Sequence, residues 1–497
     1  MIINLNNFSK KNYPKLKKKY DFVIVGAGAA GITLALELEK SNFTIALCEA
    51  GDLTESNGSK NCYKGDVIGD YYMPLDERRL RFLGGSTNHW GGWTYPLDSI
   101  DFDRGYIDQK FIWPISKNEL SPYLDKACNY LDIENSWGED NYENPSNQKK
   151  SRNLFLHDKD SKINKFDFQF SRNKGAPTRF GRKFLRPLDK SKKIDVFLNA
   201  NLKEIDGEYK NIRNIFVSNY HSLMFKLSTK NLVFAMGGIE NSRFLLWFSK
   251  IYGEKYFYKN LPIGKYWMDH PHHTIGMALL HKDIGKKSFF RVNDQLQKKH
   301  NIFNFGLRVT DHLSDFYKGP FLFSSLNKSS SKLSNLYLQQ YLHGNIRPYL
   351  LSAAWEQEPQ ESNQIILSES KKDKFDIPRV KIYYKKNDRD RETMKKSMLI
   401  FSDWIIENGL GRIKFDDWII NNSKYPKAFY QGHHMGGTRM HNSKEFGVID
   451  KNCKVYGSNN LYVVGSSIFT TGGHANPTLS IIQLTLKLAD YFKSKYK

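Results

Sequence analysis

Three glycines near the start of the chain have the spacing of a phosphate-binding turn: Gly26, Gly28 and Gly31. They follow the apolar run 22–25, which is typical of a strand buried on both faces. Glycines at these positions allow a tight turn, a close approach of the backbone to a diphosphate, and close packing of a helix on the strand. We therefore expect this turn to hold the diphosphate of a dinucleotide at the N-terminus of a helix over 29–39.

An acidic residue, Glu49, stands at the end of the next apolar run, 44–48. A carboxylate at this point of a βαβ unit can accept hydrogen bonds from the hydroxyl groups of an adenosine ribose. The alternative is a plain parallel βαβ unit with an incidental acidic residue at the strand end. We expect the first interpretation, in which Glu49 and the three glycines bind one dinucleotide.

Two further glycine-rich stretches indicate backbone that lies against a flat or charged group. Residues 84–92 contain four glycines around Ser, Thr, Asn and His, a composition that does not suit a self-supporting element. Residues 231–243 have the pattern of an apolar strand, a glycine pair and the start of a helix. This second stretch either meets the nucleotide again or is an ordinary strand, turn and helix.

The C-terminal part of the chain carries imidazole and amide side chains beside glycines. His433 and His434 lie in the stretch 431–440, and Asn476 follows a Gly-Gly-His loop. Asn476 is suited to cap a helix whose first residue is Pro477 and which continues over 478–495. In a flavoenzyme the N-terminus of this helix would face the N1 and C2 carbonyl edge of the isoalloxazine, where negative charge accumulates on reduction.

Another cluster of histidines surrounds Pro271: His270, His272 and His273. This run is geometrically awkward for one ion, and no acidic or cysteine partner stands at a familiar spacing. We therefore expect no metal site.

The composition excludes a single small domain and favours no macromolecular partner. The chain has 497 residues and a formal net charge of +23, but its lysines are scattered over the whole length and accompany no nucleic-acid-binding motif. An anionic substrate or a loose contact with a membrane surface is the alternative explanation of the charge. The four cysteines are far apart, and no run of about 18 apolar residues occurs. We expect reduced, buried thiols and a cytoplasmic protein with no integral membrane segment and no bound nucleic acid.

The pattern of the first half predicts mixed α and β structure. We expect a loosely ordered lead-in over 1–19, an amphipathic helix over 117–133 and a polar surface excursion over 137–165. Strands of an antiparallel insertion are expected at 196–199, 212–218 and 225–228.

The pattern of the second half predicts a larger sheet. Residues 274–355 alternate apolar and aromatic positions with turns, as an antiparallel sheet does. Helical spacing follows over 391–408, and a short buried strand is expected at 462–464.

Four blocks, in their order and spacing, resemble the glucose-methanol-choline (GMC) oxidoreductases, a family of FAD-dependent alcohol oxidases and dehydrogenases. The blocks are the glycine turn with Glu49, the stretch 84–93, His434-x-x-Gly437-Thr438, and the stretch 463–479. Supporting matches include Trp113-Pro114 and Asp269-His270-Pro271. The resemblance covers nearly the whole chain and is greatest to pyranose 2-oxidase-like and bacterial sugar or polyol dehydrogenase members.

The resemblance implies an α/β fold with two domains. A Rossmann-like FAD-binding domain would be built from the discontinuous segments 18–115, 191–270 and 431–497. A substrate-binding domain with a large antiparallel sheet would comprise 116–190 and 271–430. The absence of a long low-complexity linker agrees with domains that are interwoven along the chain.

The resemblance also implies a catalytic pair. His434 matches the general base that accepts the alcohol proton, and Asn476 matches the partner that hydrogen-bonds the substrate oxygen. An imidazole suits this role because its unperturbed pKa lies near working pH. The adjacent His433 is less favoured because the offset from Gly437-Thr438 selects His434.

Contacts with FAD are implied for Gly85, Ser86, Asn88, His89, Gly465, Ser466 and Pro477. His89 falls where some relatives attach FAD to a histidine, so covalent histidyl-FAD and non-covalent FAD are both open. Gly465 departs from the Asp that the family often has at this position.

The implied activity is oxidation of a CH–OH group of a sugar, polyol or related small-molecule alcohol, with hydride transfer to flavin N5. The electron acceptor, whether oxygen, a quinone or another carrier, is open. The alternatives are a lyase or decarboxylase on the same FAD scaffold and a non-catalytic FAD-binding protein.

Overall fold

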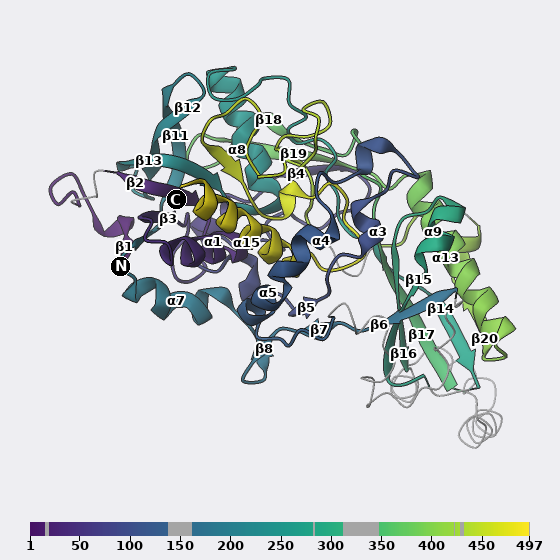
Figure 1. Cartoon of the computed structure of the whole chain (residues 1–497). Coiled ribbons are helices and arrows are strands. Elements are labelled where there is room, and N and C mark those ends of the chain that lie inside the picture. The colour runs from purple at the N-terminus through teal and green to yellow at the C-terminus, as the bar shows by residue number, and fades with distance from the viewer. Residues whose placement is uncertain are drawn as a thin grey trace.

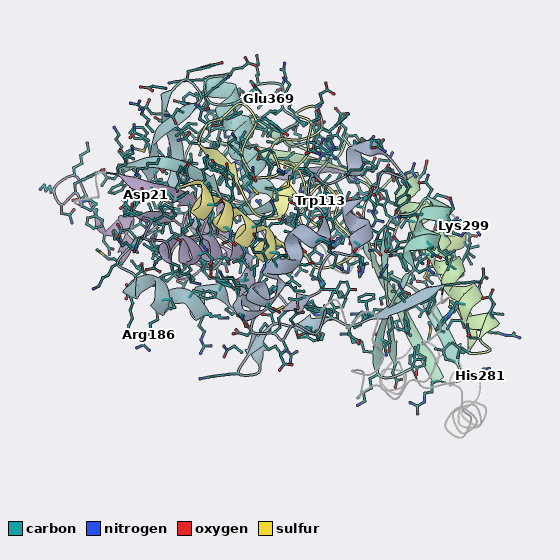
Figure 2. The ribbon with its side chains drawn as sticks, in the orientation of Figure 1. Asp21, Trp113, Arg186, His281, Lys299 and Glu369 are labelled. Atoms are coloured by element: carbon teal, nitrogen blue, oxygen red, sulfur yellow. The ribbon has the colours of Figure 1, made fainter. Side chains whose placement is uncertain are left out.

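The computed structural model describes residues 1–14, 19–137, 162–281, 284–311, 347–421, 423–427 and 432–496. Its elements form two bodies that lie side by side (Figure 1). The first body surrounds a large mixed sheet, and the second surrounds an antiparallel sheet. In Figure 2, Asp21 and Arg186 lie on the first body, and His281 and Lys299 lie on the second.

The sheet of the first body has a parallel core. Within the described residues it contains eight strands in the order β1, β10, β3, β2, β13, β12, β11, with β21 also paired with β13. The parallel strands are β1 Ile2–Asn4, β2 Tyr20–Val25, β3 Ile45–Cys48, β10 Ile194–Leu198, β13 Met224–Phe234 and β21 Leu461–Val463. Strands β11 Asn201–Glu208 and β12 Asn211–Ser218 extend β13 as an antiparallel edge.

Two predictions about this sheet are wrong. The expected loose lead-in over 1–19 contains β1, which pairs in parallel with Val196–Leu198. The run 196–199 was expected in an antiparallel insertion, but β10 is a parallel strand between β1 and β3. All five residues of β10 are buried, and four of them are apolar, as suits a strand of a parallel sheet that is covered on both faces.

Helices from both ends of the chain cover one part of this sheet and pack against each other: α1 Ala29–Glu39 and α15 Thr478–Lys495 (Figure 1). Both have the bounds that the sequence predicts, and the predicted apolar face of α15 is buried. The predicted cap is wrong by one residue, because Pro477 is the N-cap and Asn476 lies outside the helix.

The other helices of this body are α8 Gly237–Tyr252, α7 Phe180–Lys190, α4 Lys117–Leu120 and α5 Leu124–Leu131. The single helix expected over 117–133 is divided by a short 3-10 turn, Ser121–Tyr123, that contains Pro122. Proline lacks an N–H and cannot continue the α-helical hydrogen bonds, which explains the division.

The sheet of the second body confirms the predicted antiparallel region where it is described, whereas residues 312–346 of that region lie outside the described residues. Its order is β20, β14, β17, β16, β15, β6. The strands are β6 Ile163–Phe166, β14 His272–Leu280, β15 Lys287–Val292, β16 Phe305–Asp311, β17 Arg347–Trp355 and β20 Gly411–Phe415. The helix expected over 391–408 is α13 Asp388–Glu407, which packs its Met394, Met398 and Phe401 against this sheet.

A third, smaller sheet joins distant segments: β4 Asp66–Gly69, β19 Pro378–Tyr384 and β18 Gln364–Lys372. The remaining short elements are α2 Asn57–Asn61, α3 Ser99–Phe102, α9 Asp294–His300, α14 Asp417–Ile420, β5 Trp93–Thr94, β7 Gln169–Phe170, β8 Arg172–Asn173 and β9 Ala176–Pro177.

The four cysteines are buried and free, as predicted. Among the described residues no helix combines the length and apolarity needed to cross a membrane. The surface excursion expected over 137–165 lies mostly outside the described residues.

A buried network of charges joins the two bodies. The guanidinium of Arg104, which is fully buried, lies 2.6 Å from an oxygen of Asp101 and also donates to Glu356 and Gln297. Burial opposes the charge of Arg104, but the neighbouring Glu356 raises its pKa above the ordinary value. Buried charges of this kind are tolerated only when every member is paired.

We predict that Arg104→Met destabilises the protein by about 3–5 kcal/mol, because it leaves Asp101 and Glu356 buried without their cation. Urea unfolding of the two proteins measures the difference. Lys162→Met is the matched control, because Lys162 pairs with Glu407 at 2.6 Å on an exposed surface, and such pairs contribute at most about 1 kcal/mol. Equal losses in both variants would contradict the importance of the buried network.

Candidate active site

A single cavity of about 900 Å³ extends from the glycine turn after β2 to the antiparallel sheet. This is near the upper end of the range, roughly 300–1,000 Å³, that is typical of small-molecule and cofactor sites. Its first end is lined by Gly26, Gly28 and Glu49, and its far end includes Arg308 and Ser352. The cavity therefore has room for a large cofactor and for a substrate beside it.

The glycines of the turn differ in whether a side chain would collide with the protein. A Cβ at Gly26 would lie 2.5 Å from the Ala235 carbonyl oxygen, and one at Gly31 would lie 1.8 Å from the Gly26 carbonyl oxygen. These two glycines therefore allow strand, turn and helix to pack closely. A Cβ at Gly28 would meet no atom within 4 Å, and Gly28 lines the cavity. Gly28 thus leaves open the space that a diphosphate needs at the N-terminus of α1.

Glu49 stands at the end of β3 with its carboxylate in the same end of the cavity. One oxygen accepts the N–H of Ala27 at 3.1 Å, and the other accepts the N–H of Gly51 at 2.9 Å. Burial raises the pKa of Glu49, although these backbone donors oppose the shift. The carboxylate fixes the glycine turn, and its role toward a ribose remains a prediction.

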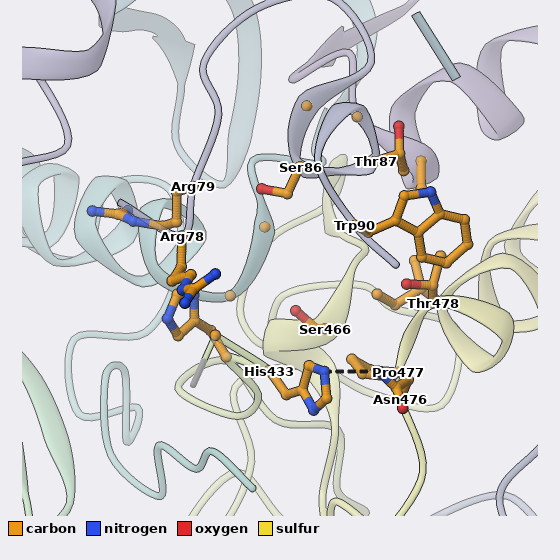
Figure 3. Close-up of a pocket in the computed structure, with 18 of the residues that line it drawn as sticks. Arg78, Arg79, Ser86, Thr87, Trp90, His433, Ser466, Asn476, Pro477 and Thr478 are labelled. Atoms are coloured by element: carbon orange, nitrogen blue, oxygen red, sulfur yellow. Dashed lines mark hydrogen bonds between the residues drawn. The ribbon is translucent and has the colours of Figure 1, made fainter. Parts of the chain in front are cut away.

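The glycine-rich block forms one wall of the cavity. Gly85–Asn88 is a 3-10 turn, and Ser86, Thr87 and Trp90 face the cavity from this wall (Figure 3). Arg179 donates to the carbonyl oxygens of Thr87 and Trp90 at 2.9 and 2.8 Å, which holds the wall in place. Asn88 does not line the cavity, because its amide donates to the Leu83 carbonyl at 2.8 Å.

His89 lines the cavity on the same wall. Burial lowers the pKa of His89, and the cation of Arg78 lowers it further. A covalent bond to FAD through His89 stays a prediction. Acid precipitation of the holoenzyme tests it, because covalent flavin remains in the protein pellet and free flavin does not.

Two further segments, both noted in the sequence analysis for their glycines, form the opposite wall of the cavity. Gly237 and Gly238 open α8 and line the cavity, and a contact with the nucleotide here stays a prediction. Gly465, Ser466 and Pro477 line it as well, and α15 begins immediately after Pro477. The predicted cofactor residues therefore surround one space, with two exceptions that do not line it: Asn88 and Gly31.

The imidazole–amide pair of the site is made by His433 and Asn476. Asn476 Nδ2 lies 2.9 Å from His433 Nε2, and both side chains line the cavity (Figure 3). The predicted pairing of Asn476 with His434 is therefore wrong. Adjacent residues of an extended segment point in opposite directions, and here His433 is the one directed at Asn476.

The loop that carries His433 is fixed by a buried carboxylate. Asp269 accepts the backbone N–H of Gly432 at 2.8 Å, of His433 at 2.9 Å and of His270 at 2.7 Å. The hydroxyl group of Tyr72 also donates to Asp269. His433 Nδ1 lies 2.9 Å from His270 Nδ1, so the ring is held at both nitrogens.

His434 also lines the cavity, but its ring lies among aromatic side chains. Its ring centroid lies 5.8 Å from that of Trp267 and 6.1 Å from that of Tyr72. Its Nε2 is buried and has no hydrogen-bond partner among the described residues. Burial lowers the pKa of His434 to about 4. Burial also lowers the pKa of His433, but the nearby Asp269 opposes that shift.

The histidine cluster around Pro271 is divided by the fold. His270 and His272 approach His433, and one ring nitrogen of each lies within 4.8 Å of the others. His273 instead packs among the rings of Trp355, Trp418 and Tyr425. The sequence missed this group because its third member lies far away along the chain, and no local spacing reveals it.

Aromatic side chains form the wall of the cavity near the antiparallel sheet. They are Trp93, Phe166, Phe168 and Phe289, which contact one another mostly edge to face. Polar groups at this end include Arg308, Ser352 and Thr274. A substrate here would meet an apolar wall and a few polar groups that orient it.

One model of a protein family matches the C-terminal part of the chain. A family model described as GMC oxidoreductase matches residues 359–485. A curated relative, 2-methyl-1,2-propanediol dehydrogenase of Mycolicibacterium austroafricanum, is 21% identical over 96% of this chain and 95% of its own.

Comparison with solved structures covers nearly the whole fold. Pyridoxine 4-oxidase from Mesorbium loti superposes with a TM-score of 0.60 at 15% identity, over 96% of this chain and 100% of that one. A formate oxidase of Aspergillus oryzae, studied for the effect of a mutation on modification of its FAD, gives a TM-score of 0.58 at 15% identity, over 96% and 98%. The two bodies are thus arranged as in these oxidases.

We predict that Gly28→Val weakens FAD binding by about 1–3 kcal/mol, the usual cost of forcing a side chain into space that must be filled by another group. The fold should survive, because no protein atom lies within 4 Å of the added Cβ. Titration of the FAD-free proteins with FAD measures the loss, and thermal melting without FAD checks the fold.

Gly31→Val is the matched control, because its Cβ would collide with the Gly26 carbonyl oxygen at 1.8 Å. This variant should lose stability even without FAD. Wild-type FAD affinity in Gly28→Val would contradict the placement of the diphosphate at this turn.

Proposed function

We propose that this chain, whose residues 359–485 match the GMC oxidoreductase model, is an FAD-dependent enzyme that oxidises a CH–OH group of a sugar, polyol or related small alcohol. The observation that carries this proposal is the His433–Asn476 pair, 2.9 Å apart on the wall of the large cavity. When bound, the flavin accepts the hydride that leaves the alcohol carbon.

The residues that would hold FAD fit its parts. Gly28 leaves open space at the N-terminus of α1, which suits the diphosphate. Glu49 at the end of β3 suits the ribose, in the manner of a Rossmann-like nucleotide site. The N-terminus of α15, with Pro477 and Thr478 lining the cavity, suits a group that gains negative charge on reduction. Ser86 and His89 complete the other wall.

His433 and Asn476 would act on the hydroxyl group of the substrate. The substrate hydroxyl group would take the place of the contact between Asn476 Nδ2 and His433 Nε2. The Asn476 amide would then donate to the alcohol oxygen, and the hydroxyl group would donate to His433 Nε2. His433 Nε2 then accepts the hydroxyl proton as the hydride departs. Asp269 and His270 keep the ring in this orientation by binding the backbone and the second ring nitrogen of His433.

We assign the proton to His433 and not to His434, which the family motif favours. His433 contacts Asn476, whereas His434 packs beside Trp267 and Tyr72. A base works best when its pKa is near the working pH. Burial lowers the pKa of His434 to about 4, which makes it a weak base. His434 as base is the alternative that the variants below separate.

Anaerobic mixing of the holoenzyme with a panel of sugars, polyols, amino alcohols and aliphatic alcohols tests the function. We expect at least one sugar or polyol class to bleach the flavin absorbance. The curated relative named for 2-methyl-1,2-propanediol supports the inclusion of small branched diols in the panel. A flavin that stays oxidised with every alcohol would point to a lyase or to a non-catalytic protein.

With an active alcohol, His433→Ala should slow flavin reduction by at least ~100-fold, the usual effect of losing a general base. His434→Ala should cause a smaller loss, and His281→Ala, which changes an exposed histidine, should cause none. Stopped-flow absorbance measures all three rates. A large loss in His434→Ala alone would return the base to His434.

The pH dependence of the rate of flavin reduction is a second test of His433 as the base. The neutral form of His433 accepts the proton, and burial lowers its pKa below 6.5. The reduction rate should therefore stay constant at neutral pH and fall only as the pH drops through a value below 6.5.

A further inference from the structure

Three imidazoles converge at the edge of the catalytic cavity: those of His270, His272 and His433. Within the part of the chain that the structure describes, one potential ligand nitrogen from each lies within 4.8 Å of the other two. The ring centroids are 5.1 Å apart for His270 and His433, 5.5 Å for His272 and His433, and 6.4 Å for His270 and His272. The proposed oxidation uses only one of these three rings as a base.

The backbone that carries these rings is held firmly. Met268 and Met435 form an antiparallel bridge with two hydrogen bonds of 2.8 and 2.9 Å, which places the His270 and His433 segments side by side. Asp269 accepts N–H groups from both segments, at His270 and at His433. His272 is the first residue of β14 and is paired with Ala354 of β17. The three rings are therefore positioned before any ligand arrives.

The geometry of the cluster suits a small cation. Zinc binds imidazole nitrogens at about 2.0–2.1 Å, so the ligand nitrogens of a tetrahedral site are about 3.4 Å apart. The Nδ1 atoms of His270 and His433 are 2.9 Å apart. One nitrogen can be chosen from each of the three rings so that all three lie within 4.8 Å of one another. Small ring rotations would bring all three to the required separation.

The donor set indicates which cations would bind. Imidazole nitrogens suit Zn²⁺, Cu²⁺ and Ni²⁺, whereas Mg²⁺ and Ca²⁺ prefer carboxylate and carbonyl oxygens. His272 and His433 line the cavity, so a cation has access to them from that side. A fourth coordination position would face the cavity and take a water molecule, as in zinc sites with three protein ligands.

We propose that His270, His272 and His433 form a binding site for a divalent transition-metal cation, and that its occupation blocks the oxidation reaction. The cation would take the Nδ1 lone pair of His433 in place of the contact with His270. A neutral imidazole has one lone pair, so coordination through Nδ1 leaves the ring proton on Nε2. Nε2 of His433 could then no longer accept the hydroxyl proton of the substrate. The blocking effect rests on the proposed role of His433, whereas the binding itself does not.

Equilibrium dialysis of the FAD-loaded protein against ZnCl₂ tests the binding. We expect one tight site per chain, and a loss of at least ~10-fold in affinity in His272→Gln and in His270→Gln. His281→Gln, which removes an exposed histidine from the end of β14, is the matched control and should bind as the wild type does. Thermal melting and flavin content identify any variant that fails to fold.

X-ray absorption at the zinc edge gives an independent readout of the ligands. Three imidazole nitrogens and one or two oxygen atoms are expected around the metal. Zinc that binds equally well to the wild type and to both folded variants, or that shows fewer than two imidazoles, would overturn the proposed site.

Anaerobic flavin reduction with an active alcohol then tests the blocking effect. Zinc should slow reduction in the wild type, EDTA should restore it, and His272→Gln should need at least ~10-fold more zinc for the same fractional loss of its own rate. Tight binding by the three histidines with an unchanged rate would overturn the blocking effect and would also argue against His433 as the base. No tight binding with a normal rate would overturn the metal site alone.

Discussion

The geometry of the active site depends on one buried carboxylate. Asp269 is 1% exposed, and it accepts three backbone N–H groups from two segments that are 163 residues apart, together with the Tyr72 hydroxyl group. A buried ionised carboxylate is stable only when its oxygens are hydrogen-bonded. The same requirement that satisfies Asp269 therefore orders the histidine loop, so folding and the orientation of His433 are inseparable.

A second constraint acts at the junction of the two bodies. The buried network around Arg104 includes Asp101 from the first body and Glu356, which follows β17 of the antiparallel sheet. Because a buried cation requires its partners, this network fixes how the two bodies are placed. The cavity lies between the glycine turn of one body and the strands of the other, so its width depends on that placement.

Local patterns in the sequence predicted the elements near the cofactor well. The bounds of α1 follow from a run of helix-forming residues after the glycine turn, and those of α15 follow from its apolar face. The glycine turn itself follows from its spacing together with the strand and helix around it. The antiparallel sheet followed from alternation. The short strand β1 was missed because three residues carry too little periodicity to be told from a loop.

The contacts of the candidate catalytic side chains could not be predicted in the same way. His433 and His434 are neighbours, and only the register of the Met268–Met435 bridge determines which ring faces Asn476. The approach of His270 and His272 to His433 depends on the same bridge. Motif offsets locate a segment along the chain, whereas the direction of each side chain is set by tertiary pairing.

The segments that line the cavity include four widely separated parts of the chain, within 26–30, 85–93, 235–244 and 465–481. A cofactor that contacts all four acts as a non-covalent cross-link that closes long loops, and the entropy of closing such loops grows only slowly with their length. A ligand bound only by the folded state also stabilises that state in proportion to the logarithm of its free concentration. The supply of FAD would thus govern how much of this chain is folded, in addition to how much of it is active.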